Sequence, residues 1–177
     1  MVSPSPGRLP LRVLFVCTGN ICRSPLVEAL FKDLVRKRGL ERRYEADSAG
    51  TYGYHEGDPA DPRTIRVGAK HGLSVDSIAR ALRADDFDRF DLLVAMDRGH
   101  LREMRARCPK AHQAKLVLMP DYDPEGALKD VPDPYYGGFE GFEEIYRILD
   151  RCSRGLLDAL ESQTLETTGA AVSLPRA

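Results

Sequence analysis

The chain has 177 residues, which corresponds to about one domain of ordinary size. Its 26 basic and 27 acidic side chains give a net charge of −1, and 42% of its residues are hydrophobic. This balance argues against a disordered chain and against a dedicated binder of nucleic acid or of anionic membranes. The longest apolar runs, Val13 to Cys17 and Leu92 to Met96, are far shorter than the about 20 residues of a membrane span.

Three regions differ in composition. Residues 1–10 are rich in Pro, Ser and Gly and predict a flexible N-terminal extension, while residues 162–177 are polar and small and predict a disordered tail. Residues 11–161 then form a single domain. No secretory signal is evident, because the first apolar run is too short. Four cysteines in a chain of this length do not make a disulfide framework, so we expect a reducing, cytoplasmic setting.

Strands and helices alternate along the predicted domain. Leu11 to Val16 is a short apolar run that reads as a buried strand. A helix follows, because apolar residues recur at helical spacing from Val27 to Leu34; Ser24 can cap its start, and Gly39 lies just past its end. The remaining elements are strands at 44–49, 92–96 and 116–119, and helices beginning at Asp61-Pro62, around Leu101 to Cys108, and over Ile145 to Leu160.

This alternation predicts an α/β fold: a small, open, four-stranded parallel sheet with helices on both faces and a phosphate-binding loop after the first strand. Ligands of such folds bind beyond the carboxyl ends of the strands. Cys17 lies at the end of the first strand, where we therefore expect chemistry.

The loop from Cys17 to Ser24 has the features of an anion-binding site. A loop that leads from a strand into a helix presents unpaired backbone N–H groups, and the helix dipole adds positive charge there. Gly19 and Asn20 tolerate left-handed backbone angles, and the Arg23 guanidinium matches two phosphate oxygens. The same positive field favours a Cys17 thiolate, which could attack phosphorus, and Ser24 could stabilise it as a leaving group.

The segment Val16 to Pro25, VCTGNICRSP, resembles the active-site signature of the low-molecular-weight protein tyrosine phosphatases. Four later segments are similar to blocks of that family in the same order, at residues 47–51, 61–63, 96–97 and 133–137, so the resemblance covers about residues 11–160. It implies a metal-independent phosphatase without cofactors that acts through a phosphocysteine on Cys17. Its partner would be a phosphotyrosine protein or a small aryl phosphate, with no nucleic acid or membrane, and the enzyme a monomer or weak homodimer.

Asp133 is the general acid and base that the resemblance implies. It lies between two prolines, which restrict the backbone and help to aim the carboxyl group. Asp121 and Asp123 are nearby alternatives that lack the family match. The resemblance also assigns the binding of phosphate and of the substrate ring to further residues: Thr18, Gly19, Asn20, Ile21, Cys22 and Ser24 in the loop, and Tyr54, Tyr135 and Tyr136 as aromatic walls.

Two departures from the family pattern affect this prediction. Many relatives have Trp where Tyr54 stands, and many have a His in place of Ser77, paired with the aspartate that matches Asp97. We therefore expect Asp97 to support the loop through another partner, with Asn20 and Ser48 as candidates.

Four other functions remain open at this stage. An arsenate reductase would need a pair of resolving cysteines, whereas Cys108 and Cys152 are better explained by packing in the core. An arginine phosphatase typically has Thr where Ile21 stands. A structural zinc site lacks close ligand spacing, and a phosphopeptide-binding module would need neither a nucleophile nor an acid. Separately, Cys22 could form a reversible disulfide with Cys17 and protect it from over-oxidation.

Overall fold

A parallel sheet of four strands lies at the centre of the molecule, in the order β2-β1-β3-β4. The computed structural model describes residues 10–168. The strands are β1 (Leu11–Cys17), β2 (Tyr44–Gly50), β3 (Leu92–Ala95) and β4 (Leu116–Leu118). The α/β fold and the four parallel strands are therefore confirmed.

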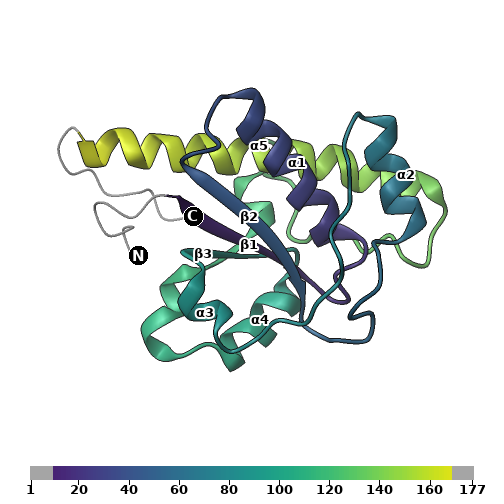
Figure 1. Ribbon diagram of the computed structural model, residues 1–177, viewed down its shortest axis with the longest axis horizontal. Coiled ribbons are helices and arrows are strands. Elements are labelled where there is room, and N and C mark those ends of the chain that lie inside the picture. Colours follow the sequence, from purple (N-terminus) through teal and green to yellow (C-terminus); the bar gives the residue numbers. More distant parts are fainter. Residues whose placement is uncertain (1–9, 169–177) are drawn as a thin grey trace.

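Helices cover both faces of the sheet (Figure 1). On one face lie α1 (Arg23–Lys37), α2 (Pro62–Lys70) and the long α5 (Phe139–Thr168), and on the other lie α3 (Asp86–Arg89) and α4 (Arg98–Arg107). Two 3₁₀ turns, η1 (Lys110–Lys115) and η2 (Met119–Tyr122), flank β4.

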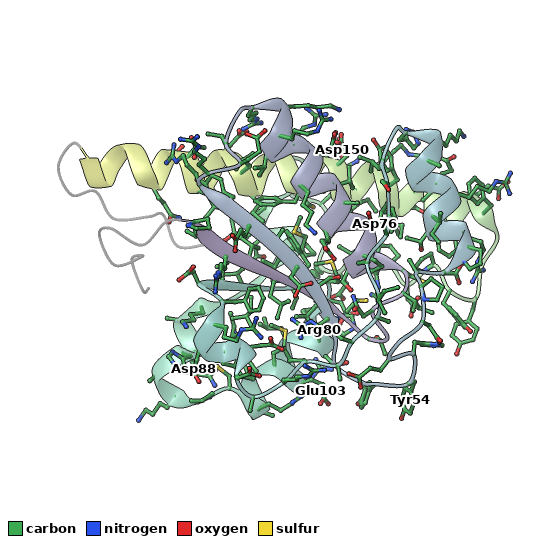
Figure 2. The ribbon with its side chains drawn as sticks, in the orientation of Figure 1. Tyr54, Asp76, Arg80, Asp88, Glu103 and Asp150 are labelled. Atoms are coloured by element: carbon green, nitrogen blue, oxygen red, sulfur yellow. The ribbon has the colours of Figure 1, made fainter. Side chains whose placement is uncertain are left out.

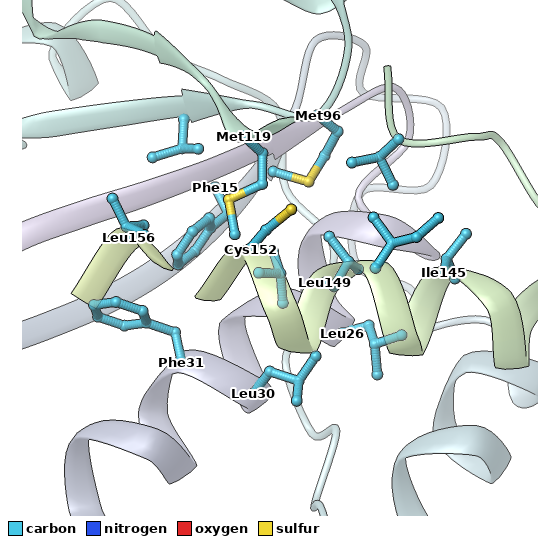
Figure 3. Packing of buried hydrophobic residues seen from close by; sticks show 14 of the residues in the cluster. Phe15, Leu26, Leu30, Phe31, Met96, Met119, Ile145, Leu149, Cys152 and Leu156 are labelled. Carbon is cyan, nitrogen blue, oxygen red and sulfur yellow. The ribbon is translucent and has the colours of Figure 1, made fainter. Parts of the chain in front are cut away.

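The side chains of β1 alternate between two hydrophobic clusters, as the pleat of a strand requires. Val13 and Phe15 pack into the larger cluster under α1 and α5, while Leu14 and Val16 pack against α3 and α4. Figure 3 shows the first of these clusters, with Phe15 beside Cys152 of α5. A strand that is buried on both faces holds its carboxyl end in a fixed place, and this end carries Cys17.

Two local predictions need correction. The first helix begins at Arg23, with Cys22 as its cap residue, so Ser24 lies in the first turn and does not cap it. Gly39 does follow the helix, with a φ of 67°. The tail predicted from residue 162 onward is wrong up to Thr168, because α5 continues through these residues. Extending an existing helix costs little, and Glu161 is held by an ion pair with Arg43.

The remaining terminal predictions, for residues 1–9 and 169–177, lie outside the described residues. Within residues 10–168, every helix is too short or too polar to cross a membrane.

Candidate active site

The loop between β1 and α1 has unpaired amides. Within residues 10–168, neither a carbonyl nor a side chain accepts a hydrogen bond from the backbone N–H groups of Gly19, Asn20, Ile21 and Cys22. Asn20 adopts a φ of 58°, the left-handed conformation that lets the loop curl. Amides left free beside a helix N-terminus are suited to bind an anion.

The Cys17 thiol lies beside this loop and contacts a hydroxyl group. Its Sγ lies 3.0 Å from Ser24 Oγ, and both residues are buried. Ser24 Oγ in turn accepts a hydrogen bond of 2.8 Å from Asn20 Nδ2. The Ser24 hydroxyl proton has two acceptors within reach, the Cys17 sulfur at 3.0 Å and the carbonyl oxygen of Ala49 at the longer distance of 3.5 Å.

A buried network holds the loop from below. Asn20 Nδ2 also donates to Ser48 Oγ at 2.9 Å, and Ser48 donates to the buried carboxylate of Glu28. Asn20 Oδ1 accepts from the backbone N–H of Arg80 at 3.0 Å. Asn20 is therefore hydrogen-bonded through both the nitrogen and the oxygen of its side-chain amide, and these bonds stabilise the left-handed conformation at which the loop curls.

The end of β2 approaches the same loop closely. A Cβ atom on Gly50 would lie 2.6 Å from the carbonyl oxygen of Thr18 and 3.1 Å from the backbone nitrogen of Asn20. Both distances are too short for a side chain, so only glycine lets β2 pass here.

Arg23 is fixed by partners from distant parts of the chain. Its side chain is 4% exposed, and Nη1 donates to Asp97 Oδ2 at 2.9 Å and to the carbonyl oxygen of Val131 at 3.0 Å. Asp97 follows β3 and caps α4 by accepting from the backbone N–H of His100. Arg23 and the α4 cap are thus the partners of Asp97, whereas Asn20 and Ser48, the candidates from the sequence, belong to the Glu28 network.

His100 is a site residue that the sequence analysis missed. Its Nε2 lies 2.7 Å from Thr18 Oγ1 and 3.5 Å from Arg23 Nη2. Nδ1 lies 3.2 Å from Asp97 Oδ1, although the two are too poorly aligned for a hydrogen bond. Because arginine can only donate, Nε2 is the acceptor and Nδ1 carries the proton. Burial, followed by the charge of Arg23, lowers the pKa of His100 to about 4, so the ring is neutral at pH 7.

Asp133 lies on the same side of Arg23 as the loop. Its Oδ2 is 3.6 Å from Arg23 Nη2, and its Oδ1 accepts from the backbone N–H of Tyr135 at 3.0 Å. The side chain is half-exposed, which leaves it open to a ligand. Of the alternatives, Asp123 is buried and bonded to Arg151 of α5, away from the loop.

A pocket of about 510 Å³ opens beside these groups, and we call it the site pocket. Its lining comes from the phosphate loop, from α4 and its cap, and from the segment that carries Asp133: Thr18, Arg23, Asp97, Arg98, Gly99, Arg102, Asp130, Val131, Pro132 and Asp133. Such a volume is typical of sites for drug-sized ligands.

The three predicted aromatic residues are exposed and lie outside this lining. Tyr54 is 81% exposed and stacks on Tyr52. Figure 2 shows Tyr54 on an outer loop. Tyr135 and Tyr136 pack edge to face, and Tyr136 is 93% exposed. His55, from the same loop as Tyr54, lies against Gly19 of the phosphate loop: its Cδ2 would be 2.9 Å from a Cβ there.

The four cysteines are free and buried. Burial, followed by the charge of Asp61, raises the pKa of Cys22 to about 12. Cys108 packs in the cluster under α4 and Cys152 in the cluster under α5, on opposite faces of the sheet. These two cannot form a resolving pair, and their packing role is confirmed. Among residues 10–168, His, Cys, Asp and Glu side chains form no group of three that could hold a metal ion.

A family model and the sequences of known proteins point to the same protein family. Residues 12–166 match the family model for low molecular weight phosphotyrosine protein phosphatases. A low molecular weight protein-tyrosine-phosphatase of Streptomyces coelicolor is 52% identical over 155 residues, which cover 86% of this chain and 94% of that protein.

Solved structures agree with these sequence matches. A crystal structure of a protein tyrosine phosphatase from Entamoeba histolytica superposes with a TM-score of 0.85 at 42% identity, covering 87% of this chain and 99% of that one. A Drosophila arginine phosphatase superposes with a TM-score of 0.79 at 33% identity, covering 85% and 98%.

Proposed function

Because the chain belongs to the low molecular weight phosphotyrosine protein phosphatase family, we propose that Cys17, Arg23 and Asp133 hydrolyse phosphotyrosine monoesters. The observation that carries the proposal is the arrangement around one point: the Cys17 thiol, the four free amides of the loop and the buried Arg23 guanidinium. A tetrahedral phosphate bound by the amides and Arg23 would have its phosphorus next to sulfur.

In the first step, the Cys17 thiolate attacks phosphorus and the bond to the tyrosine oxygen breaks. Arg23 and the loop amides stabilise the equatorial oxygens of the transition state. Asp133, whose carboxyl group lies 3.6 Å from Arg23, donates a proton to the departing phenol oxygen. The products are a phosphocysteine and the tyrosine side chain of the substrate without its phosphate.

In the second step, water attacks the phosphocysteine and Asp133 accepts a proton from that water. The S–P bond breaks, and the thiolate leaves with the Ser24 hydroxyl as hydrogen-bond donor. Inorganic phosphate is released and both residues return to their initial protonation states. The phosphate ligands in this mechanism are residues 18–22 together with Arg23. The mechanism needs a free thiol, which suits the reducing conditions of a cytoplasmic location.

Exposed aromatic rings support an aryl substrate. Tyr54, Tyr135 and Tyr136 are free to contact the ring of a bound phosphotyrosine, and each well-placed aromatic pair contributes about 0.5–1.5 kcal/mol. The apolar side chain of Ile21 in the loop also suits an aryl ester better than a guanidinium. Cys108 and Cys152 cannot serve as the resolving pair of an arsenate reductase, because the sheet separates them.

Hydrolysis of para-nitrophenyl phosphate by three proteins tests the mechanism. We expect wild type to be active with a metal chelator present, Cys17→Ser to be inactive, and Asp133→Ala to lose about 10²- to 10⁴-fold in kcat. Cys108→Ser is the matched control, since it removes a buried thiol on the far face of the sheet. Activity that survives in Cys17→Ser, or that disappears with the chelator, would overturn the proposal.

A further inference from the structure

The site pocket lies next to the phosphate loop, from which Thr18 belongs to its lining. It extends from Arg23 and Asp133 along the first turns of α4, where Arg98, Gly99 and Arg102 form its wall. A phosphoryl group bound by the amides of residues 19–22 would lie beside the Thr18 end, because these residues are not part of the lining. The α4 end is therefore available to a part of the substrate next to the phosphotyrosine.

The charges that line the pocket are almost all paired. Arg23 is bonded to Asp97 at 2.9 Å. Arg98 binds both oxygens of Asp130, with Nη2 at 2.8 Å from Oδ2 and Nε at 3.2 Å from Oδ1, and this hydrogen bonding lowers the pKa of Asp130. Asp133 lies 3.6 Å from Arg23, so among the charged lining residues Arg102 alone has no ion-pair partner in the described part of the chain.

Asp133 must be protonated to act as the acid in the first step. The lining then holds a single charge without a counter-charge, the guanidinium of Arg102. Among the side chains of residues 10–163, every carboxylate lies beyond ion-pair distance of this exposed guanidinium, although its field contributes to the lowered pKa of Asp130.

The orientation of Arg102 brings its charge to the pocket. Its Nη2 would lie 3.9 Å from a Cβ placed on Gly99, so the side chain reaches back over the preceding turn towards the start of α4. Gly99, which has no side chain, leaves that approach open. A planar guanidinium in this position is suited to bind a carboxylate through two parallel hydrogen bonds.

We propose that Arg102 is a specificity-determining residue that binds an acidic side chain, Asp or Glu, near the phosphotyrosine of a protein substrate. The proposal rests on the proposed phosphatase function of the same site. The phosphotyrosine enters the loop at Arg23, and the neighbouring carboxylate pairs with Arg102 at the α4 end of the pocket. No bond forms or breaks there, so Arg102 contributes to substrate selection and not to the chemical step.

Arg105 provides a matched control. It lies on the same helix, it is exposed, and it does not line the pocket. Arg102→Gln and Arg105→Gln therefore remove the same charge from the same helix, and only the first removes it from the pocket. Arg102→Lys keeps the charge without the bidentate geometry.

The test uses phosphotyrosine peptides that carry one Glu at a chosen position near the phosphotyrosine, each with its matched Gln peptide. The measured quantity is the ratio of kcat/KM for the Glu peptide over the Gln peptide. For at least one position we expect wild type and Arg105→Gln to prefer Glu by about two- to fivefold at low salt. We expect this preference to disappear in Arg102→Gln, to survive in part in Arg102→Lys, and to weaken at high salt.

Three results would overturn the proposal: a wild type that shows no preference at any position, a preference that survives in Arg102→Gln, or an equal loss in Arg105→Gln. Equal losses on Glu and Gln peptides in Arg102→Gln would also count against it, because Arg102 would then bind the phosphate itself. A failure of the proposed function looks different, since wild type would hydrolyse none of the peptides.

Discussion

Cys17 Sγ and Ser24 Oγ lie 3.0 Å apart in the interior of the protein, and the hydroxyl already accepts a hydrogen bond from Asn20. A Cys17 thiolate would be the nearer and the charged acceptor of the Ser24 proton, since the alternative acceptor, the carbonyl oxygen of Ala49, is neutral and lies 3.5 Å away. The main effect of this hydrogen bond falls on the second step, because the thiolate leaves only there.

Ser24→Ala should accumulate phosphocysteine. A hydrogen bond to a charged group contributes about 1.5–3 kcal/mol, so we expect kcat to fall by about 10- to 100-fold. A rapid-mixing experiment with para-nitrophenyl phosphate should show a burst of nitrophenol followed by slow turnover. Ser153→Ala, a buried serine of α5, is the matched control, and unchanged kcat in Ser24→Ala would contradict the assigned role.

Asp97→Asn should weaken both substrate binding and folding. The substitution keeps the shape of the side chain but removes the negative charge next to the buried Arg23. We expect KM to rise and the free energy of unfolding to fall by about 1–3 kcal/mol, measured by urea denaturation. Asp158→Asn, at a surface ion pair with Arg38, should change neither value appreciably. An equal effect of the two variants would show that the Arg23 contact is not special.

Stability should decrease in acid because of His100. Burial lowers its pKa from 6.5 to about 4, so between these values the unfolded chain binds a proton that the folded protein does not. The contribution of the buried neutral ring is complete above pH 6.5 and is lost as the pH falls towards 4, by at most about 1.4 kcal/mol per pH unit.

Urea unfolding at pH 7 and pH 5 measures this effect. His100→Asn, which does not titrate there, should show a smaller difference between the two pH values than wild type. The control is His112→Asn, at a surface pair with Asp88. If His100→Asn shows the same difference in unfolding free energy between pH 7 and pH 5 as wild type, titration of His100 is not the source of that difference.

The predicted protection of Cys17 by Cys22 can be tested directly. Peroxide would oxidise the Cys17 thiolate to a sulfenic acid, and the Cys22 thiol would condense with it, releasing water and forming a disulfide that thiol reductants reopen. After peroxide and then dithiothreitol, we expect wild type and Cys108→Ser to recover more activity than Cys22→Ser. Equal recovery in Cys22→Ser would remove the protective role.

The parts of the site that are local in sequence were predictable. Cys17 and Arg23 are joined by one short loop, so a strand followed by a helix was enough to place the thiol at one end of the free amides and the start of the helix, with Arg23, at the other. The error at Ser24 concerned only its capping role, because the helix begins one residue earlier, at Arg23, whereas the expected contact of the hydroxyl group with the Cys17 thiol is present.

Contacts between distant segments were not predictable in the same way. Thr18 and His100 lie 82 positions apart and meet because β1 and β3 are neighbours in the sheet. Strand order is a property of the whole fold, and the sequence does not show it. The motif Asp97-Arg-Gly-His100 carried a signal, since a capping residue and the residue three positions later lie on the same side of a helix.

Val131 has a consequence for how the enzyme works. Its backbone N–H is bonded to the carbonyl oxygen of Met96, and its own carbonyl oxygen accepts from Arg23. The segment that carries Asp133 is thereby tied both to the sheet and to the phosphate ligand before any substrate arrives. In the proposed mechanism the segment of the acid is therefore positioned by the same guanidinium that binds phosphate, and loss of either hydrogen bond of Val131 would displace acid and phosphate ligand relative to one another.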